Sequence, residues 1–365
     1  MTPNIKRIVS VLCLLAASFA VALLPAGGYC ENLRFVFMAD SPVENIPPNP
    51  TPTDLINIPI LNAIISQILA LSPRPSFVVY GGDMAACGRL NGVYNFQAFK
   101  DVMAPLTNAG IQLYTVLGNR ELLNPPDVTK FYLANQQVFQ RVFHENPGNG
   151  PAGYEHLTYS FESPGGDAFF AVLDQYYLTG DVKNPNLTGS FDDTQLNWLA
   201  AQIARTKATH KFLFTHGPYY YVVDPAEEGG PPPGITYTYL WNMLDQNRFD
   251  VYFCGHMHLF SRKTIDSGIA PNPQLTPPVQ WHNNVVQVIC GTAGAPIVTD
   301  PPCVDPALWH VSQAADTYYF TVVDINGNRV KVTSYKGNTG AYRAFDTFTI
   351  PPNAAGPAVD SLLLN

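Results

Sequence analysis

Apolar runs and amphipathic stretches alternate along the first third of the chain. Each of three apolar runs ends on a carboxylate or amide residue, and the runs occupy residues 33–40, 76–83 and 111–119. Their length and their bounding turns predict buried strands. Apolar residues at helical spacing predict one helix within 51–75, capped near Thr53 and stopped by Pro73, and another within 93–110, closed by Gly110. This order of strands and helices favours parallel pairing with right-handed crossovers.

The rest of the chain is richer in strands. Runs at 157–163 and 168–174 flank a Pro-Gly-Gly-Asp turn and predict a β-hairpin. A helix is predicted over 192–206, with a capping pattern from Asp192 to Gln195. The remaining predicted elements are a strand at 211–218, a helix at 238–250, a strand at 251–260 broken by its glycine, and C-terminal strands with an Asn-Gly hairpin turn at 326–327.

Length and composition allow one large hydrophobic core or two modest ones. The chain has 365 residues, of which 46% are hydrophobic and 13% are charged. Near its start, Lys6 and Arg7 precede an apolar run and then small residues, which predicts a secretory signal peptide at 1–28. The protein is then exported, to the periplasm, the cell surface or the medium. An uncleaved membrane anchor is the alternative, although the run is short for a spanning helix. We expect residues 29–365 to form a single domain.

Charge and cysteine content restrict the possible partners. The formal net charge is −8, and loss of the basic signal segment makes it more negative, so we expect no nucleic-acid partner. After signal cleavage we expect no membrane contact either. Six cysteines occur without any C-x-x-C pair. Cys290 and Cys303 flank a proline-rich loop and form the predicted disulfide.

Polar side chains of the metal-ligand type follow five apolar strands in succession. They are Asp40, Asp83, Asn119, His216, and the pair His256 and His258. Taken alone, each has an ordinary structural explanation as a cap, a turn former or a core histidine. Together they favour one site, because ligands bind at the carboxyl ends of the strands in such sheets. The mixture of carboxylate, amide and imidazole suits Zn, Mn or Fe.

In order and spacing, these residues resemble the motifs of the calcineurin-like metallophosphoesterases, which include the purple acid phosphatases. The matching blocks are Asp40-Ser41-Pro42, Gly82-Asp83, Gly118-Asn119-Arg120-Glu121, Thr215-His216-Gly217 and Gly255-His256-Met257-His258. The resemblance implies an α/β fold, a four-layer α/β/β/α sandwich of two mixed sheets with a two-metal site at their edge. It also implies a small phosphate ester as the substrate.

The resemblance further implies two sets of metal ligands. One metal would be held by Asp83, Asn119, His216 and His256, all of which are present. The other would be held by Asp40, by Asp83 as a bridge, by His258, and by a histidine at position 42 or, in purple acid phosphatases, a tyrosine at position 86. Those two positions are Pro42 and Ala86 in this chain. We therefore expect one complete site and one weakened site.

Arg120 stands where the family has a histidine that contacts the phosphate and protonates the leaving group. Arginine stays protonated at ordinary pH, but its planar fork binds phosphate oxygens. We expect Arg120 to point into the metal crevice as an anion-binding catalytic residue. Cys87 is a candidate for the missing ligand, against the commoner buried or disulfide-bonded cysteine. His144 and His156 either reach the phosphate from loops or are solvated surface residues.

The leading prediction is an exported metal-dependent phosphoesterase that hydrolyses phosphate mono- or diesters through a metal-activated water. The alternative is a catalytically impaired pseudo-phosphoesterase that serves as a secreted binding or structural module. The losses at positions 42 and 120 motivate that alternative. A zinc hydrolase of the H-x-H amidohydrolase or β-lactamase type is disfavoured, because its H-x-H would come early in the chain, whereas here it comes late.

Overall fold

Two six-stranded sheets form the centre of the molecule. The computed structural model describes residues 32–185, 187, 189–221, 235–267, 281–297 and 317–350. In spatial order, the first sheet contains β16 (Arg343–Ile350), β15 (Arg329–Gly337), β14 (Tyr318–Asn326), β1 (Leu33–Met38), β2 (Phe77–Tyr80) and β5 (Gln112–Thr115). The second contains β12 (Phe260–Ile265), β13 (Val285–Cys290), β11 (Val251–Cys254), β10 (His210–Phe214), β8 (Ala168–Val172) and β7 (Tyr159–Glu162).

Both sheets are mixed. In the first, β1, β2 and β5 run parallel, whereas β14, β15 and β16 pair antiparallel and join the sheet through β1. In the second, β8, β10, β11 and β13 run parallel, and β7 and β12 pair antiparallel at the edges. The predicted parallel pairing of the first three strands and the predicted hairpin at 157–174 are confirmed.

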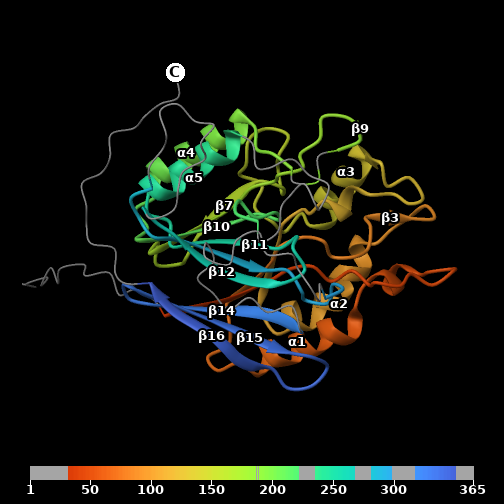
Figure 1. Cartoon of the computed structure of the whole chain (residues 1–365), viewed down its shortest axis with the longest axis horizontal. Helices are drawn as coiled ribbons and strands as arrows, with labels where there is room; N and C mark the ends of the chain where they lie inside the picture. Colours follow the sequence, from red (N-terminus) through yellow and green to blue (C-terminus); the bar gives the residue numbers. More distant parts are fainter. Residues whose placement is uncertain are drawn as a thin grey trace, which may run out of the picture.

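Helices cover the outer faces of the sheets and complete four layers. The first sheet is covered by α1 (Ile58–Ala70) and α2 (Phe96–Asn108), and the second by α4 (Asp193–Arg205) and α5 (Ile235–Gln246). Figure 1 shows the two pairs at the bottom and the top of the molecule, with the sheets between them. Smaller elements are α3 (Leu133–Val142), the short helices η1 (Pro52–Leu55) and η2 (Arg120–Leu122), and the strand pairs β3 (Arg89–Leu90) with β4 (Val93–Tyr94) and β6 (Lys130–Phe131) with β9 (Val182–Lys183). The predicted α/β/β/α sandwich is therefore observed.

Alternation along the strands distributes apolar side chains between the layers. In β1, Phe35 and Phe37 lie in the cluster between the sheets, while Val36 and Met38 face the helices of the first sheet. This follows from the period of two in a strand, which sends successive side chains to opposite faces. Both faces of β1 are buried, so the strand is apolar throughout. The core thereby fixes the strand ends that carry the candidate ligands.

The first predicted helix begins later than its capping signal indicates. Residues 52–55 form only the short helix η1, Ile56 is extended with φ −119° and ψ 134°, and α1 starts at Ile58. The interruption arises because the chain pairs here with the loop after β1. Pro42 forms an isolated antiparallel bridge with Ile56, and the Asn57 backbone N–H donates to the Ser41 carbonyl at 2.8 Å.

No helix among the described residues is long and apolar enough to cross a membrane. The predicted signal peptide at 1–28 lies outside the described residues, and so does Cys303. Its predicted partner Cys290 is a free, buried cysteine, which argues against the predicted disulfide. The physical reason is its place in β13, where its side chain belongs to the cluster between the sheets.

A buried ion pair at the start of β10 makes stability depend on pH. His210 Nδ1 lies 3.1 Å from Asp250 Oδ2, and both side chains are about 1% exposed. Burial opposes protonation of the imidazole, but hydrogen bonds to Asp250 and the Gly327 carbonyl raise the pKa of His210 above its ordinary value. A raised folded-state pKa gives stability that is fully present below about pH 6.5 and is lost as the pH rises through the folded value.

We therefore expect His210→Gln to flatten the dependence of unfolding free energy on pH from about pH 6.5 upward. Urea unfolding across this range, compared with the exposed variant His144→Gln, measures the effect. Parallel pH profiles for His210→Gln and the native protein would contradict it.

Candidate metal centre

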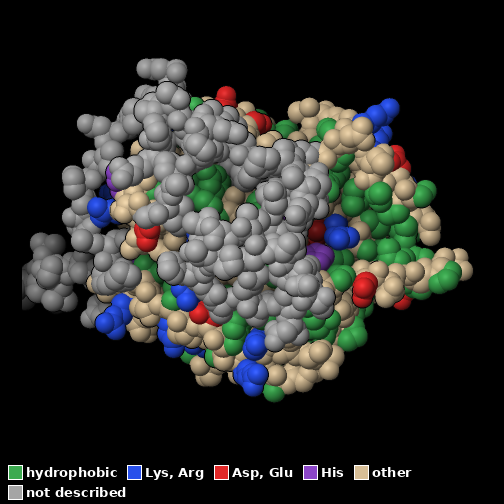
Figure 2. Space-filling model, in the orientation of Figure 1, with side chains coloured by type: hydrophobic (Ala, Val, Ile, Leu, Met, Phe, Trp, Pro, Cys, Tyr) green, Lys and Arg blue, Asp and Glu red, His purple; other side chains and the backbone are tan. Residues whose placement is uncertain are grey.

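The six predicted ligands come together where the carboxyl ends of the strands from both sheets meet. The first sheet provides Asp40 after β1, Asp83 after β2 and Asn119 after β5, and the second provides His216 after β10 and His256 and His258 after β11. Figure 2 shows acidic, histidine and basic side chains gathered right of centre on the face seen in Figure 1. The fold thus turns five distant segments into one side-chain cluster.

Four of these side chains form a tight group. Asn119 Oδ1 lies 3.1 Å from both His216 Nε2 and His256 Nδ1. The two imidazole nitrogens are 3.3 Å apart, and His216 Nε2 is 3.4 Å from Asp83 Oδ1. These four donors are therefore close enough to one another to bind a single ion.

Asp40, Asp83 and His258 form a second group that shares Asp83. One ligand atom from each lies within 4.8 Å of the others. His258 Nε2 is 3.8 Å from Asp40 Oδ1, and both Asp40 oxygens accept the His256 backbone N–H at 3.2 and 3.0 Å. This group offers three side chains where the first offers four.

Backbone strain is concentrated at the same residues. Asp40, Asp83 and His256 have φ angles of 63°, 52° and 69°, in the left-handed region that residues other than glycine seldom occupy. Neighbouring glycines make room for the carboxylates: a Cβ on Gly255 would lie 2.2 Å from Asp40 Oδ2, and one on Gly118 would lie 2.4 Å from Asp83 Oδ1. Such strain is typical of functional sites, where the surrounding structure holds residues in costly conformations.

Glu121 is not one of the predicted ligands, but it positions the loops that carry two of them. Its Oε2 accepts the backbone N–H groups of Asp83 and Gly118, and its Oε1 accepts that of Met84, each at 2.8 Å. The carboxylate is 1% exposed and joins the loops after β2 and β5. Its signal in the sequence is an acidic residue two places after the ligand candidate Asn119, in a turn of otherwise polar residues.

We expect Glu121→Ala to lower the free energy of unfolding by roughly 3 kcal/mol or more, because three buried N–H groups lose their acceptor. Metal affinity should fall about 10- to 100-fold, as for other groups that orient ligands. Urea unfolding and calorimetric metal titration measure both effects. The control is Glu145→Ala, which removes an exposed ion pair with Lys100. Equal stability of the two variants would refute the positioning role.

The imidazoles are set up as metal ligands by burial and by their hydrogen bonds. Burial, and then the charge of His216, lower the pKa of His256 to about 3; burial, and then the charge of Arg120, lower the pKa of His258 to about 4. Burial acts to lower the pKa of His216 as well, but the charge and hydrogen bond of the Asp83 carboxylate outweigh it and raise the pKa of His216 to about 9. Its Nδ1 lies 2.8 Å from the Gly81 carbonyl, which directs Nε2 toward the other donors.

The carboxylates respond to the same neighbours. Burial raises the pKa of Asp40 well above its ordinary value. Burial also acts to raise that of Asp83, but the charge and hydrogen bond of His216, and then Arg120, hold the pKa of Asp83 below its ordinary value. Both side chains are almost completely buried. A carboxylate buried in this way stays ionised only where a cation compensates its charge.

The Arg120 side chain lies beside the shared carboxylate of Asp83. Its Nε lies 3.2 Å from Asp83 Oδ2, and its backbone N–H donates to Asp83 Oδ1 at 2.9 Å. The side chain is 34% exposed, so its outer edge is open to solvent. It begins the short helix η2, which the loop after β5 forms on leaving Asn119.

The loop that carries Pro42 has a fixed path. The Ser41 hydroxyl donates to the Met84 carbonyl at 2.7 Å and accepts from Tyr80 at 2.5 Å, and the Ser41 backbone N–H donates to the Asp83 carbonyl at 2.9 Å. Pro42 is buried beside Ile56, and Ala86 donates its N–H to the Leu55 carbonyl. Neither side chain can coordinate a metal.

The other proposed site residues lie in ordinary structural surroundings. Cys87 is a buried free thiol whose Sγ lies 3.4 Å from the Arg89 carbonyl, and it belongs to neither ligand cluster among the described residues. Burial raises its pKa to about 11. His144 has an exposed side chain next to Glu145. His156 Nδ1 lies 2.6 Å from the Asn146 carbonyl. Their local hydrogen bonds account for all three residues.

The donor set therefore fits a transition metal at the first group. Carboxylate, amide and two imidazoles lie within contact distance of one another at a buried sheet edge, and oxygen and nitrogen ligands of this kind suit Zn, Mn or Fe. The second group has only three protein ligands. Water would have to complete any coordination there.

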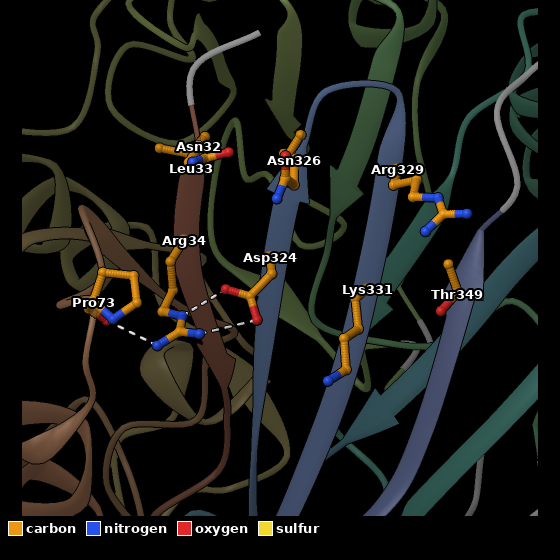
Figure 3. A pocket seen from close by; sticks show the side chains of 10 residues that line it. Asn32, Leu33, Arg34, Pro73, Asp324, Asn326, Arg329, Lys331 and Thr349 are labelled. Atoms are coloured by element: carbon orange, nitrogen blue, oxygen red, sulfur yellow. Dashed lines mark hydrogen bonds and ion pairs between the residues drawn. The ribbon is translucent and has the colours of Figure 1, made fainter.

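A separate cavity lies away from these side chains. It has a volume of about 460 Å³ and is lined by Arg34 and Asp324, among others, near the beginning of β1 and the end of β14. Figure 3 shows the Arg34 guanidinium paired there with Asp324 and the Pro73 carbonyl. Since β1 starts at this cavity and its carboxyl end leads to Asp40, the two sites belong to opposite ends of the strand.

Fold and site together define a four-layer α/β protein with a candidate metal centre at the strand ends. The family model for calcineurin-like phosphoesterases matches residues 33–260, and the chain belongs to that family. It is 23% identical over 250 residues to a protein of Dictyostelium discoideum named sphingomyelinase phosphodiesterase D, covering 67% of this chain and 54% of that protein. The chain thus spans about half the length of this curated relative.

Solved structures share the fold. A purple acid phosphatase from yellow lupin (Lupinus luteus) superposes with a TM-score of 0.60 at 16% identity, covering 89% of this chain and 54% of that one. A dimetal phosphatase from Danio rerio gives a TM-score of 0.57 at 15% identity, covering 88% and 99%. At these identities the likeness concerns the fold.

Proposed function

We propose that this protein is an exported, metal-dependent phosphoesterase that hydrolyses phosphate mono- or diesters. The observation that carries the proposal is the convergence of Asp83, Asn119, His216 and His256 at one buried point, in a member of this family. Export rests on the sequence of residues 1–28 alone.

In the proposed reaction, a water oxygen forms the new bond to phosphorus while the ester P–O bond breaks. When bound, the metal supplies Lewis acidity that activates the water and polarises the phosphoryl group. Arg120 binds phosphoryl oxygens through its guanidinium, where charge shifts in the transition state. The leaving oxygen takes its proton from solvent, because an arginine cannot donate one at ordinary pH. Esters with good leaving groups are therefore the preferred substrates.

Among such esters we favour phosphodiesters. The curated relative from Dictyostelium carries the name of a phosphodiesterase. The test is turnover of bis(p-nitrophenyl) phosphate against p-nitrophenyl phosphate by the purified protein, with its metal content measured on the same sample. Metal with turnover supports the proposal, and faster cleavage of the diester supports the substrate preference.

The second candidate is a binding module without catalysis. It is favoured by Pro42, which is held in a bridge with Ile56, and by Arg120, which already compensates the charge of Asp83. Protein that contains no metal and turns over neither ester would select this function.

A further inference from the structure

Arg120 lies beside Asp83, the residue that both ligand groups share, and so affects how many metal ions the centre can bind. Resting on the proposed function, we propose that the Arg120 guanidinium takes the place of the second metal ion, so that the centre works with one metal and one guanidinium. The substrate phosphoryl group would then be held between an ion at Asp83, Asn119, His216 and His256 on one side and the guanidinium on the other.

The two oxygens of Asp83 have different partners. Oδ1 lies 3.4 Å from His216 Nε2, on the side of the complete ligand group, and also accepts the Arg120 backbone N–H. Oδ2, the oxygen left for a second ion, lies 3.2 Å from Arg120 Nε. A bridging carboxylate needs both oxygens, and here a fixed positive charge already engages the second.

The second ligand group has only three protein side chains. Asp40, Asp83 and His258 are the members of the second group, and the loop that could add a fourth ligand is held in place by Ser41. A metal at this position would therefore have three protein ligands and a guanidinium beside one of them. Like charges at such short range repel each other strongly when they are shielded from water.

Arg120 already acts on a member of the second group. Its Nε lies 3.2 Å from Oδ2 of Asp83, and Asp83 belongs to that group. The guanidinium is thus placed beside a carboxylate that a second metal would need. Because it is a permanent cation with a planar fork of donors, it can bind phosphoryl oxygens without a proton-transfer step.

The experiment is a count of bound metal at increasing Mn²⁺, by equilibrium dialysis and elemental analysis of the native protein and Arg120→Ala. We expect native protein to stay at one Mn²⁺ per chain, while Arg120→Ala rises toward two as Asp83 Oδ2 becomes available. Arg120→Lys, which keeps the charge, should stay near one. Arg329→Ala, which removes an arginine at the distant cavity, is the matched control and should behave like native protein.

Paramagnetic resonance of Mn²⁺ provides an independent readout. Native protein should give the spectrum of an isolated ion, and Arg120→Ala at high Mn²⁺ should give that of a spin-coupled pair. Excess Mn²⁺ should also recover part of the activity of Arg120→Ala. Two metals in native protein, or the same count of one in native protein and Arg120→Ala at every concentration, would overturn the inference. Native protein without any metal would instead defeat the proposed function.

Discussion

Asp83→Asn is expected to abolish tight metal binding and to lower hydrolysis by about 10³-fold or more. Asp83 is the one residue common to both ligand groups, and its carboxylate lies within 3.4 Å of His216 and of Arg120. The amide keeps the shape but removes the negative charge. Loss of a metal that provides several kcal/mol of transition-state stabilisation corresponds to a rate decrease of this size.

The measurement is kcat/KM for a chromogenic diester together with metal content after gel filtration. Asp101→Asn, an exposed carboxylate on α2, is the control and should retain both metal and activity. Circular dichroism establishes that the variant is folded. An Asp83→Asn protein with native activity would show that the chemistry takes place elsewhere.

Arg120→Ala should lower kcat/KM by roughly 10²–10³ when metal is supplied at one equivalent per chain. This is the usual loss on removal of one preorganised donor that stabilises transition-state charge. The decrease should appear in kcat as well as in KM, because the phosphoryl charge shifts as the reaction proceeds. Arg120→Lys should keep part of the rate, since it retains the charge but loses the bidentate fork.

A titration with inorganic phosphate of protein loaded with one equivalent of metal measures the binding part of this prediction. Affinity for phosphate should weaken in Arg120→Ala and remain unchanged in the distant variant Arg329→Ala. If Arg120→Ala binds phosphate and turns over substrate like the native protein, Arg120 has no role in either step.

Much of the fold could be predicted because its signals are local and strong. The parallel order of β1, β2 and β5 follows from apolar runs that alternate with helical periodicity, and the helix α4 begins at the predicted cap, where Asp192 accepts from the Gln195 N–H. The convergence of Asp83 with His216 could be anticipated only through the motif order, since the two lie in different sheets.

Other features depend on contacts between distant segments and were beyond the reach of a single sequence. A helix was predicted with a cap near Thr53, but the short helix η1 is capped at Thr51, and the bridge between Pro42 and Ile56 ends it after one short turn. The predicted disulfide between Cys290 and Cys303 is contradicted by Cys290, which is a free thiol buried between the sheets. Spacing along the chain does not indicate which face of β13 the Cys290 side chain takes. The positioning role of Glu121 could not be predicted, because it depends on three backbone N–H groups that lie on two different loops.

The most direct test of the central claim is an anomalous difference map from crystals of the protein grown with Mn²⁺ or Zn²⁺. The account predicts one strong peak per chain, coordinated by Asp83, Asn119, His216 and His256, with the Arg120 guanidinium beside Asp83 Oδ2. A map with no peak at these four side chains, collected from protein that hydrolyses phosphate esters, would contradict it.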